Sequence, residues 1–219
     1  MVVAIDGPAG AGKSSVAARC AAELGFVYLN SGAIYRAVTW KALQDGLQDG
    51  DAEQIAAAAR SLDLQYRNGE LMIDGQRRDD ELHGAAVDQH VARHSAIEAV
   101  RAMVNRRLHQ IAERQDVVVE GRDITTVVFP RADVKIYLDA SVETRARRRW
   151  QQQEGDLSLQ QISERIIARD EADRRKTSGS LQQAADAIYL DTSDLTIAEV
   201  CDRVIHTIQN TSEYQELQG

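Results

Sequence analysis

Near the amino terminus, one run of small residues has the types and spacing that bind polyphosphate. Residues 7–14 read Gly-Pro-Ala-Gly-Ala-Gly-Lys-Ser, the pattern G-x-x-x-x-G-K-[ST], and they follow the apolar run 2–5. Glycines let backbone N–H groups approach phosphate closely, and the lysine can reach the outer phosphates while the serine hydroxyl binds Mg²⁺. Because the flanks read as a buried strand and a helix, a chance glycine-rich turn with a surface lysine is disfavoured. We therefore predict a nucleoside triphosphate site.

Nine consecutive residues form this predicted phosphate loop, with Lys13 as a catalytic candidate and Ser14 as the metal-binding candidate. They are Gly7, Pro8, Ala9, Gly10, Ala11, Gly12, Lys13, Ser14 and Ser15.

Three further segments could hold a second anion. Ser31 and Arg36 lie one helical turn apart after the second predicted strand, although Ser31 alone fits a helix cap equally well. Arg122 and Asp123 follow the third predicted strand, where the alternative is a solvated turn. Arg101 lies on a predicted helix, where a solvated face is the simpler interpretation.

A fourth segment, residues 165–176, is rich in arginine. Arg165 and Arg169 are spaced i,i+4 and share a helix face. These arginines could form surface ion pairs with Asp170, Glu171 and Asp173, or they could belong to a mobile lid that closes over phosphates. Three more arginines could join such a lid: Arg145, Arg148 and Arg149.

The elements that must position these residues alternate along the chain. We predict strands at 2–6, 26–29, 116–120 and 134–138, and helices at 13–24, 33–44, 51–62 and 97–113, with three more beginning near 142, 158 and 196. Residues 62–66 and 70–74 flank Arg67-Asn68-Gly69 and predict a hairpin. This alternation predicts an α/β fold with a doubly wound parallel sheet and helices on both faces, and ligands at the carboxyl ends of the strands.

Composition excludes several classes of function. The net charge of −8 disfavours binding to bulk nucleic acid, and no run of apolar residues is long enough to cross a membrane. Because a core strand begins at once, we expect no targeting segment, and two distant cysteines suit reduced thiols in the cytoplasm. The chain lacks a residue that would orient an attacking water and a base-specific loop, which favours a small-substrate kinase over a hydrolase or a GTPase.

Together these residues resemble the bacterial cytidylate kinases, a family of nucleoside monophosphate kinases with a phosphate loop. The resemblance covers nearly the whole chain and rests on Ile5–Ser14, Ser31–Arg36, Gly121–Ile124, Thr126–Pro130 and Arg169-Asp170 with Asp173. It implies one kinase domain in three α/β/α layers, with a core at about 1–60 and 115–210. It also implies a monophosphate-binding insertion at about 61–100, a helical lid at about 150–178 and a frayed tail at about 211–219.

The resemblance further implies ATP-dependent phosphorylation of CMP and dCMP with Mg²⁺, in pyrimidine nucleotide metabolism, by a cytoplasmic monomer. It names Lys13, Arg122 and Arg169 as catalytic. Eight residues would contact the monophosphate: Ser31, Arg36, Arg101, Arg122, Asp123, Arg169, Asp173 and Lys176. Among these, Ser31, Arg101 and Asp123 would contact cytosine, and Arg36 and Arg122 would hold its phosphate.

Four positions depart from the family's pattern. Asn30 replaces an aspartate, Ala92 a serine, Thr125 a glycine and Lys176 an arginine. They bear on the preference between CMP and dCMP and on the strictness for cytosine. Two other functions stay open: another small kinase acting on a different nucleotide or metabolite, and a nucleotide-binding regulatory module without catalysis.

Overall fold

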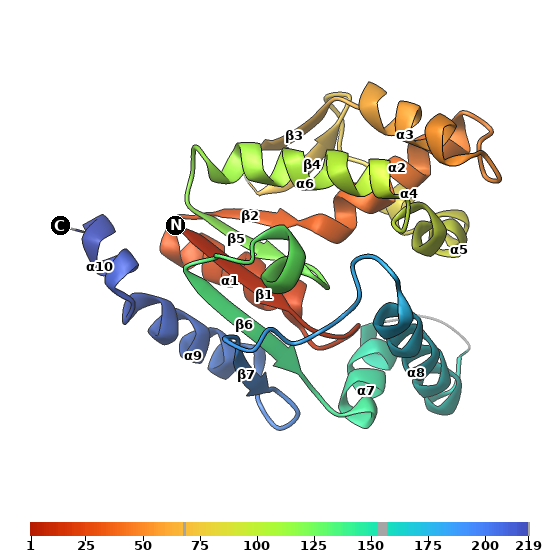
Figure 1. The fold of residues 1–219 in the computed structure, drawn as a ribbon. Coiled ribbons are helices and arrows are strands. Elements are labelled where there is room, and N and C mark those ends of the chain that lie inside the picture. Colours follow the sequence, from red (N-terminus) through yellow and green to blue (C-terminus); the bar gives the residue numbers. More distant parts are fainter. Residues whose placement is uncertain (68, 153–156, 219) are drawn as a thin grey trace. The chain divides into compact units, whose positions relative to one another are not determined.

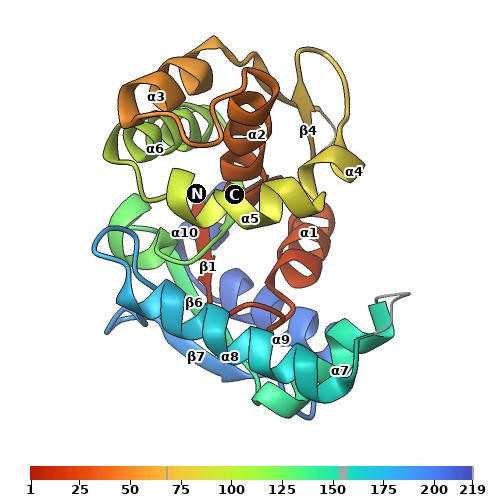
Figure 2. The same cartoon turned by 90° about the vertical axis from the view of Figure 1, so that its right-hand side faces the viewer.

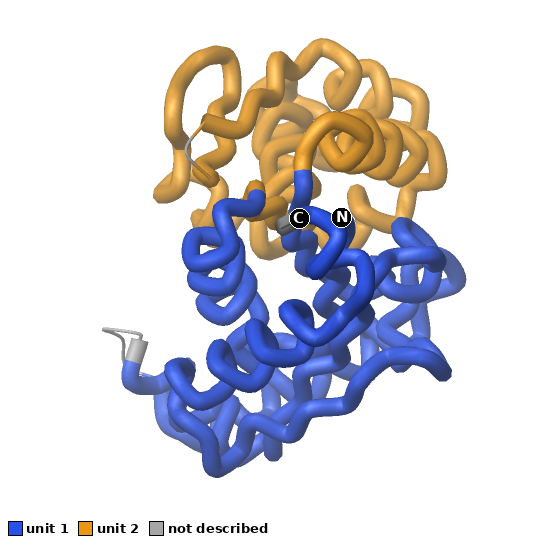
Figure 3. The backbone as a smooth tube through the Cα atoms, turned by 90° about the vertical axis from the view of Figure 1, so that its left-hand side faces the viewer, with its two compact units in different colours: residues 1–26, 116–219 blue, residues 27–115 orange. Residues whose placement is uncertain are grey.

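The computed structural model describes residues 1–67, 69–152 and 157–218 and confirms the predicted α/β fold. The chain divides into two compact units (Figure 3). Unit 1 contains residues 1–26 and 116–219, and unit 2 contains residues 27–115. Unit 2 therefore begins before the predicted insertion at 61–100 and also includes the element that follows the second strand.

Unit 1 is built on parallel strands in the order β5-β1-β6-β7 (Figure 1). They are β1 (Val2–Asp6), β5 (Val117–Glu120), β6 (Val134–Asp139) and β7 (Ile188–Asp191). β1, β5 and β6 are rich in buried β-branched residues, which is why the sequence predicts them. β7 lies at the edge and is largely exposed, so it lacks that signal. The parallel arrangement brings the ends of β1, β5 and β6 to one edge of the sheet.

The helices of unit 1 are α1 (Lys13–Leu24), α7 (Val142–Gln152), α8 (Leu159–Arg175), α9 (Ile197–Gln209) and α10 (Ser212–Gln218), with a π-helical segment η1 (Ile124–Val128). Four of them, α1, α7, α8 and α9, begin where the sequence predicts them, whereas α10 and η1 are not predicted. Ser158 with Gln161, and Thr196 with Glu199, form the predicted capping boxes of α8 and α9. α1 packs against α9 and β5, and α7 packs along α8 (Figures 1 and 2).

Helix α10 occupies the region where we expected a frayed tail. The Thr211 hydroxyl accepts a hydrogen bond from the Tyr214 N–H at 3.3 Å and so caps the first turn. The Tyr214 ring lies 6.2 Å from the ring of Phe26, centroid to centroid. An aromatic contact of this kind anchors the helix to the rest of unit 1.

Unit 2 is mostly helical. It contains β2 (Val27–Asn30), α2 (Ser31–Gln44), α3 (Ala52–Ser61), β3 (Leu64–Arg67), β4 (Glu70–Ile73), α4 (Asp79–Leu82), α5 (Ala85–His94) and α6 (Glu98–Ala112). Helix α2 is its centre, since α3, α4, α5 and α6 all pack against it. Asp51 caps α3 as predicted, in a capping box with Gln54. α4 and α5 are not predicted from the sequence.

The predicted hairpin forms. β3 and β4 are antiparallel, with Leu64 opposite Ile73 and Arg67 opposite Glu70. Asn68, in the predicted turn, lies outside the described residues, as do residues 153–156 of the predicted lid and Gly219 of the predicted tail. Within the described part of the chain, none of the helices combines the length and apolar character needed to cross a bilayer.

Candidate active site

The phosphate loop joins β1 to α1, and its backbone shows why three glycines are needed. Gly7, Gly10 and Gly12 have φ angles of 150°, 80° and 92°, in a region that side chains disfavour. At Gly7 a Cβ atom would also lie 1.9 Å from the Leu138 carbonyl oxygen of β6, so no other residue fits. The loop ends at the first turn of α1, whose N-terminal dipole favours an anion.

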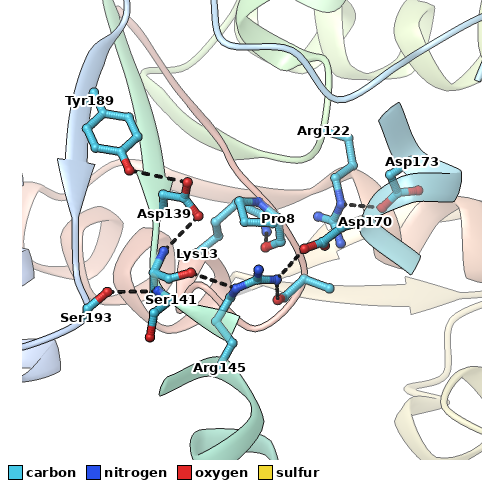
Figure 4. Close-up of polar contacts among 12 residues, drawn as sticks. Pro8, Lys13, Arg122, Asp139, Ser141, Arg145, Asp170, Asp173, Tyr189 and Ser193 are labelled. Atoms are coloured by element: carbon cyan, nitrogen blue, oxygen red, sulfur yellow. Dashed lines mark hydrogen bonds and ion pairs between the residues drawn. The ribbon is translucent and has the colours of Figure 1, made fainter. Parts of the chain in front are cut away.

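Lys13 is buried, and its ammonium group donates a hydrogen bond to the Pro8 carbonyl at 2.8 Å (Figure 4). The pKa of Lys13 is lowered from 10.5 to about 7, and burial is the largest cause. The positive charges of Arg122 and Arg169 contribute to this lowering of the pKa, whereas Glu120 and Asp6 oppose it. The lysine is therefore held next to the loop in a state that gains a proton readily when negative charge arrives.

The Ser14 hydroxyl donates a hydrogen bond to Glu120 Oε1 at 2.6 Å. Glu120 is buried at the carboxyl end of β5, and sequence reasoning did not assign it to the site. The two residues are 106 positions apart, so the only signal for this pair was that Ser14 follows one predicted parallel strand and Glu120 ends another. Because the serine proton is directed at the carboxylate, the oxygen lone pairs of Ser14 can face a cation.

Asp6, the last residue of β1, anchors the segment that carries Asp123. Its carboxylate accepts hydrogen bonds from the N–H groups of Ile124 and Thr125 at 3.0 and 2.7 Å and from the Thr125 hydroxyl at 2.7 Å. Burial raises the pKa of Asp6, and the Thr125 and Ile124 donors counteract that rise. Thr125, one of the departures from the family pattern, thus supplies a hydroxyl that a glycine lacks, and the first turn of η1 is fixed directly after Asp123.

Arg122, Asp173 and Lys176 form an ion cluster in unit 1. The Asp173 carboxylate accepts from Arg122 Nε at 2.9 Å and from Lys176 Nζ at 2.7 Å (Figure 4 shows the arginine). Burial alone would raise the pKa of Asp173, but the two cations together outweigh it and hold that pKa below its usual value. The departure Lys176 therefore keeps a cationic contact although it lacks the arginine fork. These three predicted acceptor residues are brought together by the fold.

The predicted lid arginines divide into two groups. Arg165 and Arg169 are exposed on α8, in keeping with the predicted shared face. Arg145 and Arg148 are not available to a lid. Arg145 is buried, bonded to Ala9, Ala140 and Asp170, and Arg148 donates to the carbonyls of Thr192 and Leu195.

Arg145 and Arg148 are thus committed to backbone carbonyls of the loop, of Ala140 and of Thr192 and Leu195. Their predicted place in a mobile lid is wrong. Arg149, also predicted there, is exposed.

In unit 2, the residue that caps α2 is Asn30. Its Oδ1 accepts from the Ala33 N–H at 3.0 Å, so the departure from aspartate keeps a good capping residue. Ser31 is then the first helical residue and is buried, which removes its interpretation as the cap. Ala92, the other departure in this unit, is exposed on α5.

The two predicted arginines of unit 2 are each held in position by contacts with neighbouring residues. Arg36 on α2 donates to the Leu82 carbonyl at 2.9 Å and to Asp88 of α5 at 2.7 Å. Arg101 on α6 is buried, with its guanidinium carbon 5.9 Å from the centroid of the Tyr35 ring. A solvated face is therefore excluded for Arg101, and the cation–π geometry orients its guanidinium.

Comparison with known proteins decides the family. The family model described as cytidylate kinase matches residues 3–210. The chain belongs to the cytidylate kinase family. It is accordingly a nucleoside monophosphate kinase.

Several relatives of this kinase align over almost their whole length. The cytidylate kinase of Solibacter usitatus is 39% identical over 96% of this chain and 93% of its own. That of Borrelia hermsii is 38% identical, over 94% and 97%. The cytidylate kinase of Caldanaerobacter subterraneus subsp. tengcongensis is 39% identical, over 96% of each chain.

Similarity to solved structures supports the fold alone. An uncharacterized protein from Eubacterium ventriosum shares 13% identity, with a TM-score of 0.51 and coverage of 96% of this kinase and 99% of that chain. The protein TT1252 from Thermus thermophilus shares 19% identity, with a TM-score of 0.50 and coverage of 95% of both chains.

Proposed function

We propose that the protein transfers the terminal phosphoryl group of ATP to CMP and dCMP, giving CDP or dCDP and ADP. The observation that carries this proposal is the cytidylate kinase family match over residues 3–210. The buried Lys13 beside a glycine loop at the N-terminus of α1 supports a triphosphate donor. We also propose a cytoplasmic monomer without a nucleic-acid partner, in line with the net charge of −8.

On the donor side, residues 7–15 would bind ATP. The N–H groups of the loop would surround the β- and γ-phosphates, and Lys13 would leave the Pro8 carbonyl to bind their outer oxygens. The charges of Arg122 and Arg169 both act on Lys13, since each lowers the pKa of that lysine. They would therefore lie where negative charge accumulates during transfer, which suits their proposed catalytic role.

The residues present suit Mg²⁺. The Ser14 hydroxyl and the Glu120 carboxylate lie 2.6 Å apart and are both oxygen groups, the ligand type that this hard cation prefers. Among the described residues no cluster of three or more histidine, cysteine or acidic side chains could hold a metal alone. We assign Ser14 as the protein ligand of the ion, with the Glu120 carboxylate accepting a hydrogen bond from its hydroxyl. The ion, when bound, would neutralise phosphate charge.

The acceptor residues of unit 1 have distinct proposed roles. The Asp123 carboxylate can accept from the exocyclic amine of cytosine, which uracil lacks. Arg122 would hold the monophosphate through its planar fork. Arg169, Asp173 and Lys176 would contact the sugar and phosphate, and the ion cluster among Arg122, Asp173 and Lys176 supports their joint action.

In unit 2, Ser31, Arg36 and Arg101 would contact the same monophosphate. Ser31 and Arg101 would bind cytosine, and Arg101 can donate to its carbonyl oxygen. Arg36 would bind the phosphate. The guanidinium of Arg36 already binds the Asp88 carboxylate, an anion of similar geometry, and this supports its role as an anion-binding residue.

A panel of monophosphates tests the proposal. ADP release is measured by a coupled assay with CMP, dCMP, UMP and AMP, and we expect much faster turnover with CMP and dCMP. Replacing Asp123 by alanine should lower the CMP-to-UMP ratio of kcat/KM. Background rates with both cytidine nucleotides would overturn the proposal. Turnover of another monophosphate would then favour the other small kinase, and ATP binding without transfer would favour a regulatory module.

A further inference from the structure

The carbonyl groups of the phosphate loop are held by side chains from distant elements. Arg145 of α7 donates from Nη1 to the Ala9 carbonyl at 3.1 Å, and the Thr192 hydroxyl, after β7, lies 3.3 Å from the Ala11 carbonyl. Both side chains are buried. They are 136 and 181 residues away from their loop partners, so only the folded sheet of unit 1 brings them there.

Holding a carbonyl fixes the N–H on the other side of the same peptide. A trans peptide is planar, and its C=O and N–H groups point in opposite directions. When Arg145 binds the Ala9 oxygen, the Gly10 N–H must point away from Arg145. Gly10 packs tightly there, because a Cβ atom on it would lie 3.3 Å from the Arg145 Cβ. Arg145 therefore sets the direction of one of the donors that a phosphate would meet.

Arg145 is itself fixed by two other contacts. Nε donates to the Ala140 carbonyl at the end of β6 at 2.9 Å, and Nη1 donates to Asp170 Oδ2 at 2.6 Å (Figure 4). Asp170 lies on α8, next to Arg169 and one turn before Asp173. The guanidinium thus joins the phosphate loop, the sheet edge and the helix that carries the proposed lid residues.

The free-energy cost of burying the Arg145–Asp170 ion pair indicates that the pair has a role beyond stabilising the fold. Asp170 is buried, and its Oδ1 finds no hydrogen-bond partner among the described residues. A buried ion pair with an unsatisfied oxygen is weak evidence for stabilisation, and well-packed apolar side chains often serve as well or better. By comparison, Arg165 lies at the surface, and Arg148 binds only backbone carbonyls and the Thr192 hydroxyl.

We propose that Arg145, held by Asp170, is a positioning residue that presents the Gly10 N–H to the triphosphate and connects the phosphate loop to α8. This inference rests on the proposed function, because it takes ATP as the ligand of the loop. Arg145 acts through the loop backbone and has no assigned contact with the nucleotide. Its charge is balanced by Asp170, so its effect is geometric.

The test replaces both members of the pair, so that net charge is kept. In Arg145→Met/Asp170→Leu, apolar side chains should preserve or raise the unfolding temperature. We expect the Kd for ATP, titrated without any acceptor, to rise about tenfold, the effect of disordering one donor to a charged ligand. The KM for CMP should change less than the Kd for ATP, because α8 keeps its other contacts with α7. A purely structural pair would instead show normal ATP binding in a variant that is equally stable.

The matched control is the exposed ion pair Glu171–Arg175 on the same helix. Glu171→Leu/Arg175→Met makes the same chemical change without touching the loop, and its ATP affinity should equal that of the wild type. Wild-type ATP affinity in Arg145→Met/Asp170→Leu would overturn the inference. If the wild-type protein itself bound no ATP, the proposed function would fall, and this inference with it.

A second variant decides the question if the double variant does not unfold cooperatively. Arg145→Lys keeps the charge beside Asp170, but one ammonium group cannot reach Ala9, Ala140 and Asp170 together. Weakened ATP binding with a smaller change in the KM for CMP supports the inference. ATP binding like that of the wild type overturns it.

Discussion

In unit 1, the polar contacts around the phosphate loop are buried, and many of them go to the backbone. The side chains of Arg145 and Asp170 are each only 4% exposed. In unit 2, Arg36 and Arg93 also bind backbone carbonyls, but their carboxylate partners lie near solvent. Arg36 binds an Asp88 that is 49% exposed, and Arg93 binds an Asp49 that is 86% exposed.

This difference separates two ways to hold an anion-binding residue. Buried contacts to backbone fix a site before the ligand arrives, because no water can replace a lost partner. An exposed ion pair contributes little free energy, so a phosphate can replace the carboxylate at small cost. We therefore expect the donor half in unit 1 to be preformed and Arg36 in unit 2 to exchange Asp88 for the monophosphate.

The largest effect should come from Lys13. Replacing it by methionine keeps much of the side-chain volume but removes the charge that stabilises the transferred phosphoryl group. We expect kcat to fall about a thousandfold or more. The measurement is steady-state ADP release with saturating CMP, together with circular dichroism to show that the fold persists.

The chain offers a close control in Lys135 of β6. It is also a buried lysine of unit 1, and its Nζ donates to the Pro130 carbonyl at 2.6 Å, as Lys13 does to Pro8. Lys135→Met should lower stability but leave kcat near the wild-type value. A loss of less than about tenfold in Lys13→Met would contradict the catalytic assignment.

Arg36→Met should give the next largest effect, and only on the acceptor side. Loss of a charge-assisted pair to phosphate should raise the KM for CMP about 10- to 100-fold, with the Kd for ATP unchanged. Initial rates over a range of CMP concentrations measure the first quantity, and titration with ATP alone measures the second. An unaltered KM for CMP would remove Arg36 from phosphate binding.

Arg93 serves as the matched control in the same unit. It donates to the carbonyls of Gln48 and Gly50 and pairs with Asp49, so its contacts resemble those of Arg36 in kind, although Arg93 is more exposed. Arg93→Met should change neither the KM for CMP nor the affinity for ATP. Equal effects of the two replacements would indicate that unit 2 was disturbed as a whole.

The two halves also differ in what the sequence could predict. The phosphate loop is contiguous, and the capping boxes at Ser158 and Thr196 span four residues each, so local rules find them. Glu120 beside Ser14, and Arg145 beside Ala9, need the sheet to bring together residues more than a hundred positions apart. From its sequence spacing alone, Arg145 was grouped with the arginines that could join a mobile lid.

In unit 2, the sequence located candidate residues but not their environment. Asn30 and not Ser31 caps α2, because the strand runs one residue further than its apolar pattern. α4 and α5 were missed since α4 is a single turn and α5 has only Val87 and His94 buried. Without α5 the partner of Arg36 could not be anticipated, and the exchange of Asp88 for phosphate depends on that helix.

The smallest expected effect is the uptake of a proton when ATP binds, and this uptake should distinguish Lys13 in unit 1 from Arg36 in unit 2. The pKa of Lys13 is lowered from 10.5 to about 7, first by burial and then by Arg122. Bound triphosphate must raise it again. At pH 8 the free lysine is mostly neutral, so ATP binding should take up about 0.9 proton, and affinity should fall as pH rises above 7. At pH 6 the lysine is already charged, and the uptake should almost vanish.

Calorimetric titrations in buffers of different ionisation enthalpy measure this uptake. CMP binding should show no such uptake at pH 8, because guanidinium groups do not exchange protons in this range and Arg122 and Lys176 hold the pKa of Asp173 below its usual value. Lys13→Met should abolish the uptake on ATP binding, and Lys135→Met should retain it. Uptake that persisted in Lys13→Met would place the titrating group elsewhere. The contrast in burial therefore predicts a donor site in unit 1 that binds its phosphate with a proton, and an arginine in unit 2 that exchanges one anion for another.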